Sequence, residues 1–201
     1  MALENKLGIT DSARLAREEE KISKAKAKEL FESGILDSLH PGTYVTLARI
    51  HEFLFGEIYD FAGKMRTVNI AKGNFRFAPL MYLQISLENI DKMPQSSYDE
   101  IIEKYVEMNI AHPFREGNGR SMRIWLDLIL KKEIHQVIDW RKVDKEDYLL
   151  AMERSPIRDI EIKHVLKQAL TDEINSREIY MKGIDTSYYY EGYVTYKTEE
   201  L

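Results

Sequence analysis

Apolar residues recur at intervals of three and four along most of the chain, which is the spacing of one buried helix face. The clearest stripe follows Thr43 and consists of Leu47, Ile50, Leu54 and Ile58. The same periodicity, with capping residues or helix breakers at the ends, predicts several helices before the C-terminal tail. They are expected over about 11–32, 43–59, 80–93, 97–111, 122–132, 144–154 and 157–174.

The helical pattern is interrupted between residues 61 and 79. There Phe75 and Phe77 alternate with a charged residue, directly after the turn-forming sequence Lys72-Gly73-Asn74. Alternation beside a glycine-containing turn predicts a β-hairpin. Residues 134–140 are interpreted as a short apolar connection. The chain is therefore predicted to be all-α with a small β element.

Length and composition narrow the class of protein. A chain of 201 residues suits one domain, and 44% hydrophobic with 31% charged residues suits a folded cytoplasmic protein. The net charge of −5 argues against a direct nucleic-acid partner, and no apolar run reaches membrane-spanning length. Because cysteine is absent, disulfides and thiolate zinc sites are excluded. The oligomeric state stays open, with a homo-oligomer among the alternatives.

Two polar features are interpreted as structural. The charged residues 17–28 are expected to form a solvated helix face, because the basic residues there are offset by Glu18, Glu19 and Glu20. None of the other histidines has a second ligand at metal spacing, so no histidine metal site is expected. These histidines, expected to be structural or exposed, are His40, His51, His135 and His164.

One stretch, His112–Arg123, concentrates groups that bind phosphate. Pro113 and two glycines separate one expected helix from the next, so the stretch forms a helix–loop–helix corner. The backbone N–H groups of Gly117–Gly119 lie where the second helix begins, at the positive end of its dipole. Arg120 and Arg123 share one face of that helix. Guanidinium groups bind phosphate oxygens well, so the corner predicts a polyphosphate site.

Three further side chains complete this candidate site. Asn118 adds an amide, and Glu116 can hold a divalent cation that bridges phosphate oxygens. His112 stands at the entrance of the loop, and its ordinary pKa near 6.5 suits a general base.

At every defined position His112–Arg123 resembles the Fic motif, His-x-Phe-x-(Asp/Glu)-Gly-Asn-Gly-Arg-x-x-Arg. The resemblance implies the all-α Fic fold, a helical bundle with a small β-hairpin flap. It implies a single Fic domain over residues 1–201, with its core at about 43–154. It also implies a protein adenylyltransferase, which moves AMP from ATP to a hydroxyl side chain (Tyr, Ser or Thr) of a target protein and releases pyrophosphate.

The motif assigns expected roles position by position. His112 would deprotonate the target hydroxyl, and Glu116 would hold Mg²⁺ between the α- and β-phosphates of ATP. Arg120 and Arg123 would bind the outer phosphates. The anion hole would consist of the Asn118 side chain and the backbone of Gly117, Asn118, Gly119 and Arg120.

The predicted hairpin resembles the flap of Fic proteins, which covers the active site and pairs with the target as an added strand. A protein target is therefore expected along about residues 68–79, with Lys72 near the nucleotide.

Other activities remain as alternatives. The related Doc branch, which phosphorylates its target, has Lys where this chain has Gly119, so the resemblance favours AMP transfer. Transfer of phosphate or of another nucleotide moiety stays open. A nucleotide-binding regulator without turnover is a further alternative, but binding phosphate alone would not require His112.

The C-terminal tail contains a second recognisable sequence. Ser187-x-x-x-Glu191-Gly192 resembles the inhibitory motif of Fic proteins, (Ser/Thr)-x-x-x-Glu-(Gly/Asn), and a short helix is expected over about 184–192. The resemblance implies that Glu191 pairs with Arg123 and obstructs the γ-phosphate of ATP. Some relatives also use this glutamate to remove AMP, which the sequence leaves open. Without the Fic motif, the tail would be interpreted as a tyrosine-rich helix that only packs on the surface.

Overall fold

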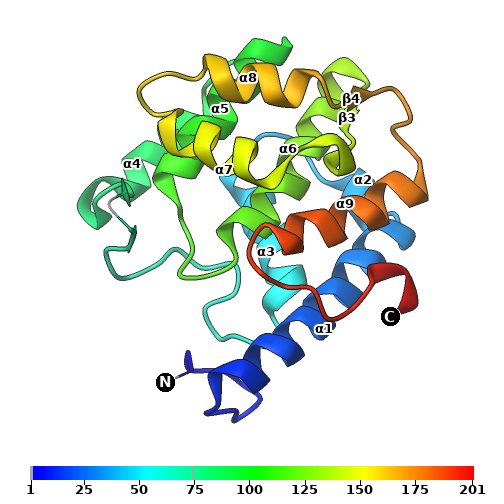
Figure 1. Ribbon diagram of the computed structural model, residues 1–201. Coiled ribbons are helices and arrows are strands. Elements are labelled where there is room, and N and C mark those ends of the chain that lie inside the picture. Colours follow the sequence, from blue (N-terminus) through cyan, green and yellow to red (C-terminus); the bar gives the residue numbers. More distant parts are fainter. Residues whose placement is uncertain (1, 74) are drawn as a thin grey trace.

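Helices build most of the molecule in the computed structural model, which describes residues 2–73 and 75–201 (Figure 1). The long helices are α1 (Ser12–Glu32), α3 (Tyr44–Phe55), α4 (Leu80–Asp91), α5 (Tyr98–Ala111), α6 (Asn118–Ile134), α7 (Lys145–Arg154) and α9 (Arg177–Tyr189). The shorter helical segments are α2 (Ile35–Ser38), η1 (Trp140–Lys142), α8 (Ile160–Lys167) and η2 (Thr198–Glu200). The predicted all-α class is confirmed.

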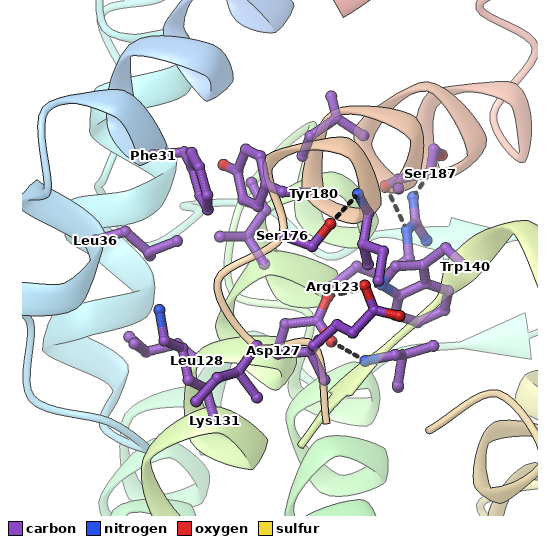
Figure 2. Close-up of a pocket in the computed structure, with 18 residues that line it drawn as sticks. Phe31, Leu36, Arg123, Asp127, Leu128, Lys131, Trp140, Ser176, Tyr180 and Ser187 are labelled. Atoms are coloured by element: carbon purple, nitrogen blue, oxygen red, sulfur yellow. Dashed lines mark hydrogen bonds between the residues drawn. The ribbon is translucent and has the colours of Figure 1, made fainter. Parts of the chain in front are cut away.

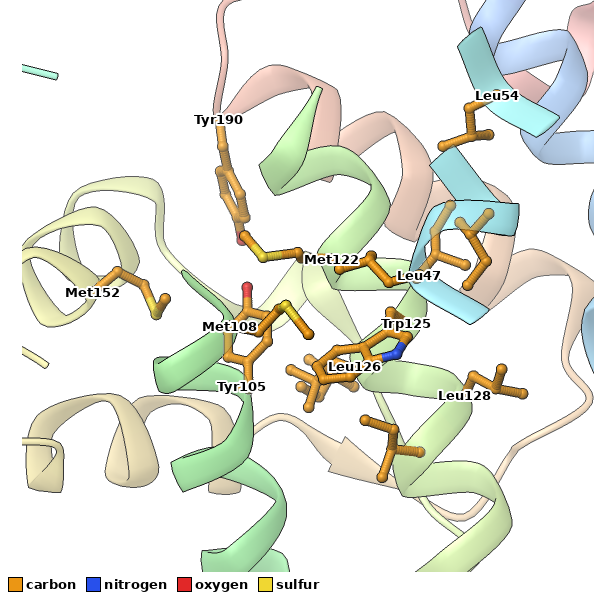
Figure 3. Close-up of a cluster of buried hydrophobic side chains, with 14 of the residues drawn as sticks. Leu47, Leu54, Tyr105, Met108, Met122, Trp125, Leu126, Leu128, Met152 and Tyr190 are labelled. Carbon is orange, nitrogen blue, oxygen red and sulfur yellow. The ribbon is translucent and has the colours of Figure 1, made fainter. Parts of the chain in front are cut away.

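Helix α6 is the centre of the packing and contacts α3, α5 and α9. It is buried around most of its circumference, from Met122 through Trp125 and Leu126 to Leu130. Figure 3 shows Trp125 and Leu126 meeting Leu47 of α3 and Met108 of α5. A helix that is buried on all sides must bury its polar residues too. This is why both arginines of the motif lie inside the protein.

The side-chain caps expected from the sequence are present. The Asp11 carboxylate accepts the Arg14 N–H at 2.7 Å and starts α1. Ser97 and Glu100 form the reciprocal capping box of α5, and the Asp144 carboxylate accepts two N–H groups at the start of α7. These local contacts satisfy the first N–H groups of each helix, which have no partner within the helix.

The predicted hairpin is small. Strands β1 (Ala71–Lys72) and β2 (Phe75–Arg76) pair antiparallel, with Lys72 opposite Phe75. Asn74 of the predicted turn lies outside the described residues.

Some predicted helices have different ends in the structure, and α6 begins at Asn118, not near Met122. Helix α3 ends at Phe55, not near Tyr59, although Ile58 beyond its end is still fully buried. Continuous helix over 157–174 was a wrong prediction, because α8 ends at Lys167.

A second hairpin was missed. Strand β4 (Leu170–Thr171) pairs antiparallel with β3 (Val137–Ile138), which lies in the segment interpreted as a plain connection. Each strand has two residues, too few to show an alternating pattern.

The solvated face predicted for residues 17–28 is also wrong in part. Glu19, Glu20 and Lys24 are at most 2% exposed, and they face the C-terminal tail that runs along α1 (Figure 1). No helix among residues 2–73 and 75–201 has both the length and the apolar character needed to span a membrane.

Candidate active site

The motif forms the corner between α5 and α6. His112 caps α5 in the left-handed conformation, with φ of 48°, and its N–H donates to the Met108 carbonyl at 2.9 Å. Gly117, with φ of 78°, precedes the first turn of α6. The first N–H groups of a helix have no acceptor within it, so this end of α6 offers donors to an anion.

The Asn118 side chain bonds to the loop that precedes it. Its side-chain oxygen accepts the Phe114 N–H at 2.9 Å, and its amide nitrogen donates to the Phe114 carbonyl at 2.7 Å. The side chain is buried and closes the loop on itself. Asn118 therefore clasps the loop that presents the backbone N–H groups, and its amide nitrogen carries a second N–H, so its contact with phosphate stays a prediction.

His112 is held as a neutral imidazole. Its ring stacks on Phe77 of the flap with centroids 3.6 Å apart, and Nδ1 lies 3.3 Å from the Asn109 carbonyl oxygen. Burial lowers its pKa to about 4, against smaller contributions from Asn109 and Glu191 that raise it. A proton on Nδ1, directed at that carbonyl, leaves the lone pair of Nε2 to accept a proton from a substrate.

Arg66 fixes the position of His112, and nothing in the sequence pattern marked it. Its Nε donates to the His112 carbonyl at 2.9 Å, and its Nη1 and Nη2 donate to the carbonyls of Val68 and Ala78 at 2.8 and 2.5 Å. These last two residues stand at the two ends of the flap. One buried guanidinium therefore ties the flap to the corner that carries the histidine.

Three carboxylates surround Arg120, which is fully buried. Nη1 lies 2.5 Å from Glu19, Nη2 lies 3.0 Å from Glu116, and Nε lies 2.8 Å from Glu191 without the alignment of a hydrogen bond. Burial alone would lower the pKa of Arg120, but Glu19 and Glu191 raise it well above its ordinary value. The guanidinium is therefore permanently charged and firmly held.

Arg123 binds the end of α9. Its Nε donates to the Ser187 hydroxyl at 2.6 Å, and Nη2 donates to the Ser187 carbonyl at 2.9 Å and to Glu191 Oε1 at 2.7 Å. Figure 2 shows Arg123 reaching Ser187 from α6. The expected contact between Glu191 and Arg123 is present, and the same carboxylate also contacts Arg120, which was not expected.

Glu191 lies beyond the helix that was expected to carry it. Helix α9 begins at Arg177 and ends at Tyr189, so the short helix predicted over 184–192 is wrong at both ends. Glu191 stands in the turn that follows, and its side chain is 18% exposed. Burial alone would raise its pKa, but Arg120 and Arg123 together hold the pKa below its usual value. The Glu191 carboxylate is thus ionised and forms ion pairs with both guanidinium groups.

The Glu191 carboxylate also covers Gly119. A methyl group at Gly119 would collide with Glu191 Oε1 and would come within 2.9 Å of Arg123 Nη1. The Lys found at this position in the Doc branch therefore could not coexist with Glu191 where it stands.

Glu116 offers one carboxylate at the edge of the corner. Its Oε1 accepts from Arg120 Nη2 and from the Gly117 N–H, both at 3.0 Å, and the side chain is 40% exposed. In the described part of the chain no three His, Cys, Asp or Glu residues group as a metal site. A single carboxylate nevertheless fits Mg²⁺, which binds one or two carboxylates together with substrate phosphates.

Two other predicted residues can now be placed. His51 is buried: Nε2 lies 2.8 Å from the Glu116 carbonyl oxygen, and Nδ1 accepts the Gly63 N–H at 3.0 Å. Burial lowers its pKa to about 3, so it is a structural residue, as interpreted. Lys72 is exposed on β1, where its charge acts on both His112 and Glu191.

A separate pocket lies on the other side of Arg123. It is lined by apolar residues of α1, α6 and α9, with Asp127 and Trp140 inside it (Figure 2). Asp127 accepts the Ile138 N–H at 2.9 Å and the Trp140 Nε1–H at 2.7 Å. His112 and residues 116–120 do not line this pocket, so it is distinct from the candidate active site.

The Fic/DOC family model matches residues 41–130. Protein adenylyltransferase VbhT of Bartonella schoenbuchensis is 33% identical over 199 residues, which cover 90% of this chain and 40% of VbhT. The Salmonella typhimurium protein called "Probable protein adenylyltransferase Fic" is 26% identical over 187 residues, covering 88% of this chain and 90% of that protein. This chain therefore spans less than half of VbhT but most of the Salmonella protein.

The fold is shared with a solved structure. The crystal structure of BepC from Bartonella tribocorum, with bound AMPPNP, matches with a TM-score of 0.67 at 17% identity. The match covers 85% of this chain and 93% of that one. The predicted Fic fold is confirmed.

Proposed function

The chain belongs to the Fic/DOC family, and from that premise we propose that it is a protein adenylyltransferase, which moves AMP from ATP to a hydroxyl side chain of a target protein. One observation carries the proposal. A neutral imidazole at His112 stands beside the start of α6, where the Glu191 carboxylate contacts two buried guanidiniums. A base next to a polyphosphate site is the minimum that this reaction needs.

In the proposed reaction each residue has one task. His112 Nε2 accepts the proton of the target hydroxyl, whose oxygen attacks the α-phosphorus of ATP, and pyrophosphate leaves. The backbone of Gly117–Arg120 and the two guanidiniums bind the phosphates. Glu116 would hold Mg²⁺, and the ion would offset the negative charge of the phosphates.

Glu191 is proposed to restrain this activity. It bridges Arg120 and Arg123 at 2.8 and 2.7 Å, and it stands over Gly119 at the start of α6. An ionised carboxylate there repels the phosphates of ATP and occupies the donors that they would use.

The target is proposed to dock along the flap, about residues 68–79. The flap strands pair with each other over two residues each, so their outer edges can accept an added strand. Phe77 connects this surface to His112 through the stacked rings. Lys72 would contribute positive charge near the nucleotide.

We propose that residues 1–201 form a single Fic domain with its core at about 43–154. The enzyme is proposed to act in the cytoplasm, where ATP is available.

The test is transfer from ATP labelled on the α-phosphate into a cell lysate, with ATP labelled on the γ-phosphate in parallel. The Glu191→Gly variant is expected to label a target from the α-label only. Adding His112→Ala should reduce labelling by about 10²–10⁴-fold, because it removes the general base. His164→Ala is the matched control, since His164 is exposed on α8.

Two outcomes would contradict the proposal. Labelling from the γ-phosphate would indicate phosphoryl transfer. Full labelling by the His112→Ala variant would show that the imidazole is not the base.

A further inference from the structure

Glu19 lies in the middle of α1, in the stretch whose charge suggests a solvated face, yet it is 2% exposed. Its Oε1 accepts from Arg120 Nη1 and, at 2.8 Å, from the Tyr193 hydroxyl. Its Oε2 accepts from the Tyr59 hydroxyl, just beyond α3. A carboxylate that is held on both oxygens has one orientation, and it imposes that orientation on the guanidinium it contacts.

The three carboxylates around Arg120 differ in what happens to them when ATP binds. Glu191 occupies the guanidinium groups that the phosphates would bind, so it must withdraw before ATP can reach the two arginines. Glu116 is 40% exposed and is the proposed ligand of the cation. Glu19 is enclosed by α1, α3 and the tail, and neither ATP nor a cation would compete for it.

We propose that Glu19 is the positioning residue for Arg120 in the nucleotide-bound enzyme. It anchors Nη1 from behind and leaves the rest of the guanidinium to the outer phosphates of ATP. This inference rests on the proposed function, because it requires Arg120 to bind phosphate once Glu191 has left.

The packing around Arg120 supports this role. The guanidinium carbon lies 4.9 Å from the ring centroid of Phe55 and 4.7 Å from that of Tyr193. These rings confine the guanidinium but cannot fix its rotation in its own plane, since they offer no directional acceptor. Glu19 supplies that acceptor. Without Glu19, the buried Arg120 guanidinium would lose its permanent hydrogen-bond acceptor and its fixed orientation.

The neighbouring residue provides a matched control. Glu20 is also a buried carboxylate of α1, at 1% exposure, and it pairs with Lys24 at 3.0 Å and with the Thr195 N–H at 2.9 Å. It has no contact with Arg120 among the bonds of the described residues. Replacing either glutamate with glutamine removes one buried charge from the same helix, but only Glu19→Gln changes the arginine.

The experiment measures dissociation constants for ATP and for AMP, with Mg²⁺, in the Glu191→Gly background. AMP lacks the outer phosphates that Arg120 is proposed to bind, so AMP binding shows whether the rest of the site is folded. Glu19→Gln is expected to weaken ATP binding about ten-fold, or about 1.4 kcal/mol, and AMP binding by less than about two-fold. Glu20→Gln is expected to change neither by more than about two-fold.

The outcomes separate the inference from the proposed function. If the Glu191→Gly parent binds ATP no more tightly than AMP, the phosphate site itself is wrong, and the inference falls with it. If the parent prefers ATP but Glu19→Gln binds it as well as before, or loses ATP and AMP equally, Glu19 is only a structural residue. Should Glu19→Gln fail to fold, Glu19→Asp keeps the charge and withdraws it by one methylene, so the same selective loss for ATP is expected.

Discussion

At the scale of single residues, the pKa of His112 gives a prediction for the pH dependence of activity. Burial lowers that pKa to about 4, so the neutral form that can accept a proton persists well below neutral pH. In Glu191→Gly a carboxylate that raises this pKa is absent, so kcat/KM is expected to stay level from neutral pH down to about pH 5 and to fall at or below pH 4. A fall centred near 6.5, the ordinary pKa of histidine, would contradict it.

Glu116 allows a second prediction at this scale. Both of its hydrogen bonds are accepted by Oε1, so Oε2 can ligate a cation. Glu116→Gln keeps the shape but offers a neutral amide, a poorer ligand for Mg²⁺. A titration of transfer against Mg²⁺ should shift to higher concentrations, with lower turnover at saturation. Glu107→Gln, on the exposed face of α5, is the control, and a Glu116→Gln curve that overlays it would show that Glu116 does not hold the ion.

The motif residues could be located from the sequence because their chemistry is concentrated within twelve positions. Glu19 and Arg66 could not, because their partners are distant in sequence: Glu19 meets Arg120 and Tyr193, and Arg66 meets Ala111 and His112. A charged residue on a charged helix predicts exposure until its partner is known. Asn118 stays a predicted phosphate ligand, and its bonds to Phe114 were not foreseen from the sequence.

At the scale of elements, the end of α9 provides a prediction about restraint. Glu191→Gly should raise transfer, and it should do so only while Arg123 is present, since the freed guanidinium must take the γ-phosphate. Removing a partly buried ion pair shifts the equilibrium by a few kcal/mol at most, so activation of about ten-fold or more is expected.

The measurement is the transfer rate of wild type, Glu191→Gly, Arg123→Ala and the double variant on one responsive target. The activating effect of Glu191→Gly should disappear in the Arg123→Ala background. If Glu191→Gly is no faster than wild type, the tail only packs on the surface.

Helices could be predicted from the sequence where the three- and four-residue spacing of apolar residues, or a capping residue, marks them clearly. Helices α1, α5 and α7 each begin at a side-chain cap, and their predicted ends agree with the structure. Helix α9 has a mixed composition and begins at Arg177, well before the predicted start. Ser176 caps it, and its hydroxyl accepts the Ile179 N–H at 3.3 Å. Strands β3 and β4 are joined only in space, so neither could be recognised from its own neighbours.

At the scale of the whole molecule, the two ends of the chain are joined by buried charges. Lys24 of α1 is 1% exposed and contacts Glu20 at 3.0 Å, Asp185 of α9 at 3.2 Å and the Tyr196 carbonyl at 2.6 Å. Asp185 precedes Glu191 in the chain and Tyr196 follows it. One ammonium therefore holds the segment that carries Glu191 from both sides.

Lys24→Met keeps the length of the side chain and helix propensity but leaves two carboxylates without their cation. Breaking a buried ion pair in this way costs about 3 kcal/mol of unfolding free energy, which urea denaturation can measure from the midpoint at constant slope. Because the tail is then held less firmly, the folded variant should also transfer AMP faster than wild type at a temperature well below its midpoint. Lys21→Met, at an exposed position of the same helix, is the control and should change neither quantity appreciably. A stability loss without activation would mean that Lys24 supports the fold alone, and that the position of Glu191 depends on the two arginines and not on α1.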